Sequence, residues 1–390
     1  FYAPFRDATT TGPGAPTKQA AYRAVTAIRY GIVPGFGRLA DFLEHEYIPK
    51  ARESTAASDG VDGRAWYDQQ LYRHTTVRLT AQQIHDTGLA EVARIRSEML
   101  LVIAQTDFPR KGEFAAAGSD ELFKAFVDYL RTDPRFYFTD GEALLSGYRD
   151  LSKRIDAELP HLFGRLPRTP YGVREMPLAA AKVSPTAYYY QGSLKGGLAG
   201  YFVANTWRLD QRPRYEMTAL TLHEAVPGHH LQIMLAQELA DDDAALHPFR
   251  TTLGYTAFVE GWALYAERLG MEVGGPAPRP DDAQTGRGSG LFADPYDNFG
   301  RLTYEMWRAT RLVVDTGIHA LGWGRQRAID FMLANTALSP LNIEREVDRY
   351  IAWPGQATAY KLGELAIRGM RTDAQRELGD KFDLRAFHDE

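Results

Sequence analysis

The sequence contains no cysteine among its 390 residues. Thiolate metal ligands, disulfides and cysteine nucleophiles are therefore excluded. It also lacks any apolar run near the roughly 20 residues that a membrane-spanning helix requires. The chain has a formal net charge of −5 and contains no basic tract. Both features argue against a nucleic-acid partner. What remains is an ordinary globular composition, 44% hydrophobic and 24% charged, with enough length for one large domain or two.

The absence of cysteine does not decide the compartment, because it fits a periplasmic or secreted protein and a cytoplasmic one equally. The chain begins at Phe1 rather than at methionine, so we expect a fragment or a processed form. A signal peptide upstream would have been lost in such a form. Localisation and oligomeric state therefore stay open.

The densest cluster of chemically active side chains lies between His223 and His230, where three of the ten histidines surround Glu224. A His-Glu pair at the end of an apolar turn, followed by further histidine, is typical of zinc hydrolases. Neutral imidazoles bind the metal, and the adjacent Glu takes a proton from the attacking water. In the common H-E-x-x-H form the two histidines are four residues apart and share one helix face.

This sequence departs from that form, because Pro227 stands at i+4 and the next histidines stand at i+6 and i+7. In an undistorted helix His223 and His230 would share a face. Pro227 and Gly228, however, predict a break or a bulge, and a two-residue bulge would bring His229 to the i+4 place. From the residues alone, the second ligand is either His229 or His230.

A helix predicted over 251–272 supplies the third ligand. Its Glu260 and Glu267 are seven residues apart and so lie on one face. A carboxylate on a helix a few dozen residues after the histidines is the third-ligand arrangement of a large class of zinc peptidases. We expect Glu260 to be that ligand and Glu267 to be the alternative, or a partner that orients a ligand histidine.

Helical periodicity extends through most of the chain and predicts a mainly α architecture. Thr80 with Gln83 has the capping-box spacing, and His85 is expected on the solvated face of the helix that follows. The expected helices are 18–52, 66–76, 80–105, 119–131, 139–158 and 299–321. Composition changes at Pro160, so we expect a helical N-terminal part, 1–159, and a catalytic part, 160–390, within one cleft-containing unit. The Gly/Pro-rich stretch 274–290 is either a lid or an insertion.

Two β-prone runs, 188–193 and 201–206, predict a small sheet just before the His-Glu helix. An edge strand at that place would let an extended substrate pair with it. Tyr190 and Asn205 are accordingly candidates for substrate contact, although consecutive tyrosines serve core packing equally well.

The helix predicted over 299–321 is apolar, yet Arg308, Arg311, Asp315 and His319 form one stripe along it. We expect this stripe to be buried as a paired network. In a peptidase cleft such groups would hold a substrate carboxylate or stabilise the tetrahedral oxyanion. Arg308 is the candidate for the carboxylate, and Arg311 or His319 for the oxyanion.

The stretch 353–363 combines turn residues with the start of a helix. Tyr360 in it is a candidate hydrogen-bond donor to the oxyanion. Gln356 and Lys361 are candidates for further substrate contacts.

With these residues in hand, the chain resembles a large bacterial family of unknown function called DUF885, which is related to the helical gluzincin peptidases, among them oligopeptidases and thermostable carboxypeptidases. The motifs that carry the resemblance are His-Glu-Ala-Val-Pro-Gly-His-His-Leu-Gln (223–232), Val-Glu-Gly-Trp-Ala-Leu-Tyr-Ala-Glu (259–267), Arg-Leu-Val-Val-Asp-Thr-Gly-Ile-His (311–319) and Trp-Pro-Gly-Gln-Ala-Thr-Ala-Tyr-Lys-Leu-Gly (353–363). The likeness runs from about Phe1 to the C-terminus.

The resemblance implies a helical fold with a deep cleft and a zinc-dependent hydrolase. It favours His229 over His230 as ligand, with Glu224 as general base and Glu260 as third ligand. We therefore expect a Zn²⁺ peptidase acting on short peptides, carboxypeptidase- or dipeptidase-like. The alternatives are a metal-dependent enzyme for a non-peptide metabolite and a non-catalytic helical binding protein with a degraded site.

Overall fold

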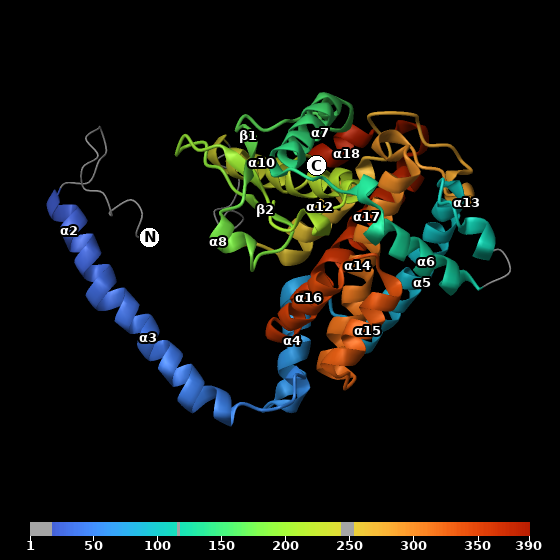
Figure 1. Ribbon diagram of the computed structural model, residues 1–390. Coiled ribbons are helices and arrows are strands. Elements are labelled where there is room, and N and C mark those ends of the chain that lie inside the picture. The colour runs from blue at the N-terminus through green and yellow to red at the C-terminus, as the bar shows by residue number, and fades with distance from the viewer. Residues whose placement is uncertain (1–17, 115–117, 243–252) are drawn as a thin grey trace. The chain divides into compact units, whose positions relative to one another are not determined.

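The computed structural model describes residues 18–114, 118–242 and 253–390, and its contacts divide the chain into two units, 1–54 and 55–390. Figure 1 shows both units in chain colours. The first unit is helical from Lys18 to Lys50, close to the predicted 18–52. It contains α2 Lys18–Ala27, a π-helical turn Ile28–Ile32, α3 Val33–Phe42, a second π-helical turn Leu43–Tyr47 and a 3₁₀ turn Ile48–Lys50. The boundary expected between residues 159 and 160 does not coincide with this division. Pro160 lies inside the helix Gly141–Leu162, which belongs to the second unit.

The second unit is mainly helical, which confirms the expected mainly α architecture. Its helices before the sheet are α4 Gly63–Thr75, α5 Ala81–Gln105, α6 Ser119–Thr132 and α7 Gly141–Leu162. Those after the sheet are α9 Met217–Glu224, α10 His229–Asp242, α12 Thr256–Leu269, α13 Asp282–Thr285, α14 Pro295–Ala320, α15 Arg325–Asn335, α16 Pro340–Ala352, α17 Ala359–Leu378 and α18 Leu384–Asp389. No described helix is both long and apolar enough to cross a membrane.

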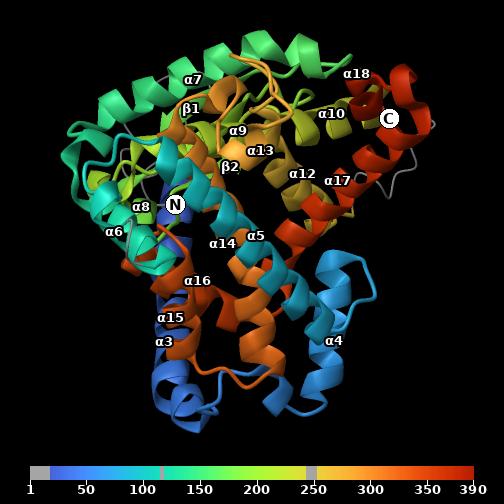
Figure 2. The ribbon, with the colours of Figure 1, turned by 90° about the vertical axis from the view of Figure 1, so that its right-hand side faces the viewer.

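Helix α14 forms the centre of this unit. Every residue from Asn298 to His319 on it is buried, the pattern of a helix covered on all sides. Helix α5 runs along it, as Figure 2 shows, and Gly88 permits the close approach: a Cβ there would lie 2.7 Å from side-chain atoms of Leu312 and Val313. The α5 capping box at Thr80 and Gln83 is present as predicted, but His85 is buried, with its Nδ1 2.9 Å from the Thr316 hydroxyl.

A three-stranded sheet precedes α9, in the order β1-β3-β2. Strands β2, Ala187–Tyr190, and β3, Gly200–Ala204, are the two predicted runs and pair antiparallel. Strand β1, Tyr171–Glu175, was not predicted; it pairs parallel with β3 on the side away from β2. A short helix, α8 Leu178–Ala181, joins β1 to the stretch before β2. Strand β2 is therefore an edge strand, and it faces the site described below.

The stretch 274–290 contains α13 and packs against α5, where the Gln105 side-chain amide donates to the Thr285 carbonyl at 2.9 Å. The helix expected over 251–272 corresponds to α12, and its first two residues lie outside the described ranges.

Candidate functional site

The predicted helix break lies between α9 and α10. Helix α9 ends at Glu224, the Val226–Pro227 peptide is cis, and α10 begins at His229. Gly228 is required in the turn, because a Cβ there would lie 1.9 Å from the His223 carbonyl oxygen. The indole N–H of Trp262 on α12 donates to the Pro227 carbonyl at 2.8 Å and so ties the turn to that helix.

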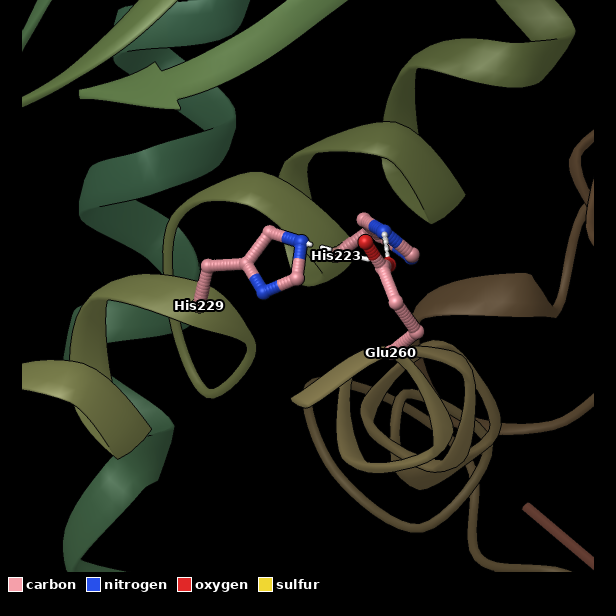
Figure 3. Close-up of side chains that lie close together, drawn as sticks. All are labelled: His223, His229 and Glu260. Carbon is pink, nitrogen blue, oxygen red and sulfur yellow. Dashed lines mark ion pairs between the residues drawn. The ribbon is translucent and has the colours of Figure 1, made fainter. Parts of the chain in front are cut away.

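This turn brings His223, His229 and Glu260 together (Figure 3). Glu260 Oε2 lies 3.5 Å from His223 Nε2 and 3.6 Å from His229 Nε2, and all three candidate ligand atoms are within 4.8 Å of one another. Ligand atoms of a tetrahedral zinc site with bonds of ~2.0–2.1 Å are separated by roughly 3.3 Å. The three side chains are therefore spaced for one such ion.

His230 has a different role, which separates the two ligand candidates. Its Nε2 donates to the Thr169 carbonyl at 3.0 Å, and its Nδ1 accepts from the Tyr189 hydroxyl at 2.9 Å. Both ring nitrogens are thus used in holding α10 to the sheet. His229 instead has its Nε2 3.6 Å from Glu260 Oε2.

Glu267 orients the first histidine. It lies seven residues after Glu260 on the same face of α12. Its Oε1 accepts a hydrogen bond from His223 Nδ1 at 2.8 Å. With Nδ1 protonated, Nε2 of His223 presents its lone pair to the metal position. The predicted choice between Glu260 as ligand and Glu267 as supporting partner is the one the geometry supports.

Electrostatics fit a cation between these groups. Burial alone would raise the pKa of Glu260, but the imidazoles of His223 and His229 beside it hold the pKa at about 2. Burial lowers the pKa of His229 to about 4, so this imidazole is neutral at pH 7. Glu260 Oε2 is buried and accepts no hydrogen bond from the described residues. A buried carboxylate oxygen without a donor is a costly arrangement that a metal ion would compensate.

Glu224 stands beside the metal position, 8% exposed, and its carboxylate accepts a hydrogen bond from the backbone N–H of Tyr189 on the edge strand β2. Burial raises its pKa to about 7, with Glu260 adding to the effect and His223 opposing it. A carboxylate with a pKa near neutrality is suited to take up and release a proton.

These groups line a cavity of about 910 Å³, which is the size of a small-molecule or short-peptide site. Of the twelve residues predicted for the site, seven line it: His223, Glu224, His229, Glu260, Arg308, Arg311 and Tyr360. Strand β2 contributes Tyr188 and Tyr189 to the wall.

The α14 stripe is buried as a paired network, as predicted. Arg308 Nη2 lies 3.5 Å from Glu267, and Arg311 Nη2 donates to Glu346 on α16 at 3.0 Å. Arg308 Nε and Arg311 Nη1 have no hydrogen-bond acceptor among the described residues. Both side chains line the cavity, and each has one buried N–H group without such an acceptor.

Tyr360 is placed by its neighbours in the turn that begins α17. The Gln356 side-chain amide donates to its hydroxyl at 3.4 Å, and the Arg311 guanidinium carbon lies 4.3 Å from the centre of its ring. Burial raises the Tyr360 pKa, and the nearby charge of Glu260 raises it further, so the hydroxyl stays protonated as a donor. Gln356 thus supports Tyr360 and does not itself line the cavity.

Four predicted residues lie elsewhere. His319 does not reach the cavity, because its Nδ1 accepts from the Ala57 N–H and its Nε2 donates to the Tyr350 carbonyl, both at 3.0 Å. Lys361 is fully buried, with its Nζ 2.9 Å from each of Glu91, Glu305 and Glu364. It joins α5, α14 and α17.

The other two come from the sheet region. Tyr190 is the outermost residue of β2, is 55% exposed and packs against Arg174. Asn205 is buried and donates to the Ala181 and Pro185 carbonyls, at 2.8 and 3.1 Å. It therefore holds residues 181 and 185 in place without lining the cavity itself.

Three supporting groups were not predicted from the sequence: Trp262, the His230–Tyr189 pair and the Glu346–Tyr350 pair. The Tyr350 hydroxyl accepts from Arg311 Nε at 2.9 Å and donates to Glu346 at 2.7 Å, so it fixes the guanidinium. The only local signal was the i,i+4 spacing of Glu346 and Tyr350 on α16, which is common on helices without any such role.

Comparisons with known proteins agree with the fold. The model of DUF885, a family described as bacterial proteins of unknown function, matches residues 1–390. Two solved structures are similar, each of a protein described as a putative lipoprotein. The one from Colwellia psychrerythraea is 30% identical with a TM-score of 0.82, over 97% of this chain and 60% of that chain. The one from Shewanella oneidensis is 19% identical with a TM-score of 0.66, over 99% of this chain and 66% of that chain, and shows the fold alone.

This chain therefore spans less than two thirds of the length of either solved relative. Among the curated proteins no significant match is found.

Proposed function

The chain belongs to the DUF885 family, and from the geometry of its site we propose that it is a zinc-dependent hydrolase that cleaves amide bonds of short peptides with a free C-terminal carboxylate. The observation that carries the proposal is the convergence of His223, His229 and Glu260 beside Glu224 on one cavity. The family description assigns no function, so the relation to gluzincin peptidases remains a prediction.

His223, His229 and Glu260 would hold the metal. Zinc at this position supplies a Lewis acid that polarises a carbonyl oxygen and acidifies water. Glu224 accepts a proton from the water as the new carbon–oxygen bond forms. It returns the proton to the amine nitrogen as the carbon–nitrogen bond breaks, so that one water is consumed for each amide cleaved.

Tyr360 and Arg311 are the candidates to stabilise negative charge on the former carbonyl oxygen. Both line the cavity, and Arg311 is held in place by Tyr350 and Glu346. Donors fixed before the reaction stabilise developing charge without having to reorganise. Arg308 is the candidate to hold the substrate carboxylate, because it lines the same cavity as Glu224 and its Nε–H has no acceptor among the described residues.

The test is hydrolysis of a set of short peptides, each with a free and an amidated C-terminus, by the zinc-loaded protein. The Glu224→Gln variant should keep its metal and lose roughly 10²–10⁴-fold of the rate, the usual effect of a general base. Arg308→Ala should reduce cleavage of the free-acid peptides more than that of the amides. Arg301→Ala is a suitable control, because Arg301 is also buried on α14 but does not line the cavity.

Equal loss on acid and amide peptides in Arg308→Ala would refute the role in carboxylate binding. Zinc-loaded protein that cleaves none of the peptides, but does cleave other small amides or esters, would favour a non-peptide substrate. Failure with every substrate would favour a binding protein.

A further inference from the structure

The charge of the cavity wall is opposite to that of the protein. The chain carries a formal net charge of −5, yet six arginines line the cavity against four carboxylates. Two of those carboxylates, Glu224 and Glu260, belong to the candidate metal site. A concave wall of one sign concentrates ligands of the other sign. The arginines are Arg208, Arg212, Arg308, Arg311, Arg345 and Arg349.

Three of these arginines have carboxylate partners outside the metal site. Arg311 and Arg349 share Glu346, each at 3.0 Å, and Arg208 pairs with Asp210 through two hydrogen bonds of 2.6 and 2.8 Å. Arg308 faces Glu267 at 3.5 Å. These four guanidinium groups are at least partly neutralised by the protein.

Arg212 and Arg345 differ, because neither has a carboxylate within 4.0 Å in the part of the chain that the structure describes. Arg345 Nη1 donates to the Lys182 carbonyl at 2.8 Å. Arg212 donates from Nε to the Asn205 carbonyl at 3.2 Å and from Nη1 to the Gln211 carbonyl at 3.0 Å. Carbonyl acceptors orient a guanidinium but form no ion pair with it. The charge of Asp210 also acts on Arg212, but Asp210 is itself hydrogen-bonded to Arg208.

Both arginines contact the same wall segment, which runs from residue 182 to residue 187 and lines the cavity from 183 onward. Arg345 holds it at the Lys182 carbonyl, and Arg212 reaches the Thr186 hydroxyl at 3.5 Å. The guanidinium groups of Arg212 and Arg345 thus both lie against this segment, on one side of the cavity. The metal site belongs to other elements, α9, α10 and α12.

One buried carboxylate approaches Arg212 and must be considered. Glu216 lies in a side cavity of about 160 Å³ that shares Arg212 with the main one. Burial raises the Glu216 pKa to about 8, although the charges of Arg212 and Arg308 oppose the rise. Glu216 is therefore mostly protonated at pH 7 and does not neutralise Arg212.

From these contacts we propose that Arg212 and Arg345 form a second anion subsite, so that the substrate is a short peptide with an acidic side chain in addition to its terminal carboxylate. This inference rests on the proposed function. The terminal carboxylate would be held near Arg308, and the side-chain carboxylate would bind at the segment 182–187. Guanidinium groups suit this role because they form charge-assisted, often bidentate, hydrogen bonds to carboxylates.

The experiment compares peptides that differ only by Glu, Gln or Ala at one position. Their binding to zinc-loaded Glu224→Gln protein is measured by calorimetry, so that no turnover is needed. We expect the Glu peptide to bind roughly tenfold or more tightly than the Gln peptide, the effect of one charge-assisted hydrogen bond. The added substitution Arg345→Gln should remove most of that preference.

Arg376→Gln is the matched control, because it removes the same charge from an exposed site on α17 that does not line the cavity. Its preference for Glu should equal that of the parent protein. Equal binding of the Glu and Gln peptides would overturn the proposal, as would a preference that survives in the Arg212→Gln, Arg345→Gln double variant.

These outcomes are separate from failure of the proposed function. If the wild type cleaves no peptide, the hydrolase is refuted, while the calorimetry still measures the subsite. If it cleaves neutral and acidic peptides with equal kcat/KM and binds them equally, the hydrolase stands and the subsite does not.

Discussion

Substitution of Gly261 by alanine tests how the carboxylate ligand is positioned. Helices α12 and α17 cross with Gly261 against Gly363, and a Cβ at position 261 would lie 2.5 Å from the Gly363 Cα. Contact between carbon atoms is optimal at about 3.5–4.0 Å. The two helices would therefore have to separate by roughly 1 Å. Glu260 precedes Gly261 on α12, and Tyr360 lies one turn before Gly363 on α17, so separation also moves these two groups.

The expected free-energy change combines two opposing effects. Alanine is favoured over glycine in a helix by about 1 kcal/mol, whereas overpacking typically costs about 1–3 kcal/mol or more. The clash here is with backbone atoms, which cannot move aside as a flexible side chain does. We therefore expect Gly261→Ala to lower the free energy of unfolding by about 1–2 kcal/mol and to weaken zinc binding.

Gly369→Ala provides the matched control on α17, because a Cβ there would meet nothing within 4 Å. Only the helix preference applies, so this variant should be more stable than the wild type by about 0.5–1 kcal/mol. Urea unfolding of both variants and zinc titration measure the two effects. If Gly261→Ala were as stable as Gly369→Ala and bound zinc as the wild type does, the reasoning from helix contact would be refuted.

Two further substitutions test other parts of the site. Glu267→Gln should weaken zinc binding by about 10–100-fold, because it removes the charge that orients His223. The control Glu272→Gln, just after the end of α12, should leave zinc affinity unchanged. Equal zinc affinities of the two variants in a titration would contradict this role of Glu267. Burial alone would raise the pKa of Glu346, but the charges of the two arginines beside it hold the value at about 2, below the ordinary 4.5. Its stabilisation, at most about 3 kcal/mol, is therefore complete above pH 4.5 and is lost as the pH falls toward 2. The stability deficit of Glu346→Gln in urea should shrink over that range, and a deficit independent of pH would count against the assignment.

The sequence predicted those features that depend on local spacing. The capping box at Thr80 and Gln83, the β-prone runs and the break at Pro227-Gly228 all follow from steric and hydrogen-bonding preferences of neighbouring residues, and all are present. Strand β1 was missed because its pairing with β3 joins residues some 30 positions apart.

Assignments that depended on which helix face meets the cavity were less reliable. Arg308, Arg311 and His319 lie on one stripe, yet only the two arginines line the cavity, because Ala57 and Tyr350 take up the imidazole of His319. Lys361 follows Tyr360 directly, but its ammonium group lies in a buried ion cluster away from the cavity. Spacing along one helix does not reveal which neighbour covers each face.

The choice between His229 and His230 shows the same limit. Local geometry left both open, and the decision depends on the sheet, since Tyr189 and Thr169 occupy both nitrogens of His230. No pattern within 223–232 contains that information.

The central claim is tested most directly by the zinc content of purified protein, measured by elemental analysis after zinc loading, for the wild type and for His223→Ala, His229→Ala, His230→Ala and Glu260→Ala. The account predicts about one zinc per chain in the wild type and in any His230→Ala protein that folds, and loss of zinc from the other three. Circular dichroism would confirm that each variant is folded. A wild type that binds no zinc, or a folded His229→Ala that retains it while a folded His230→Ala does not, would contradict the account.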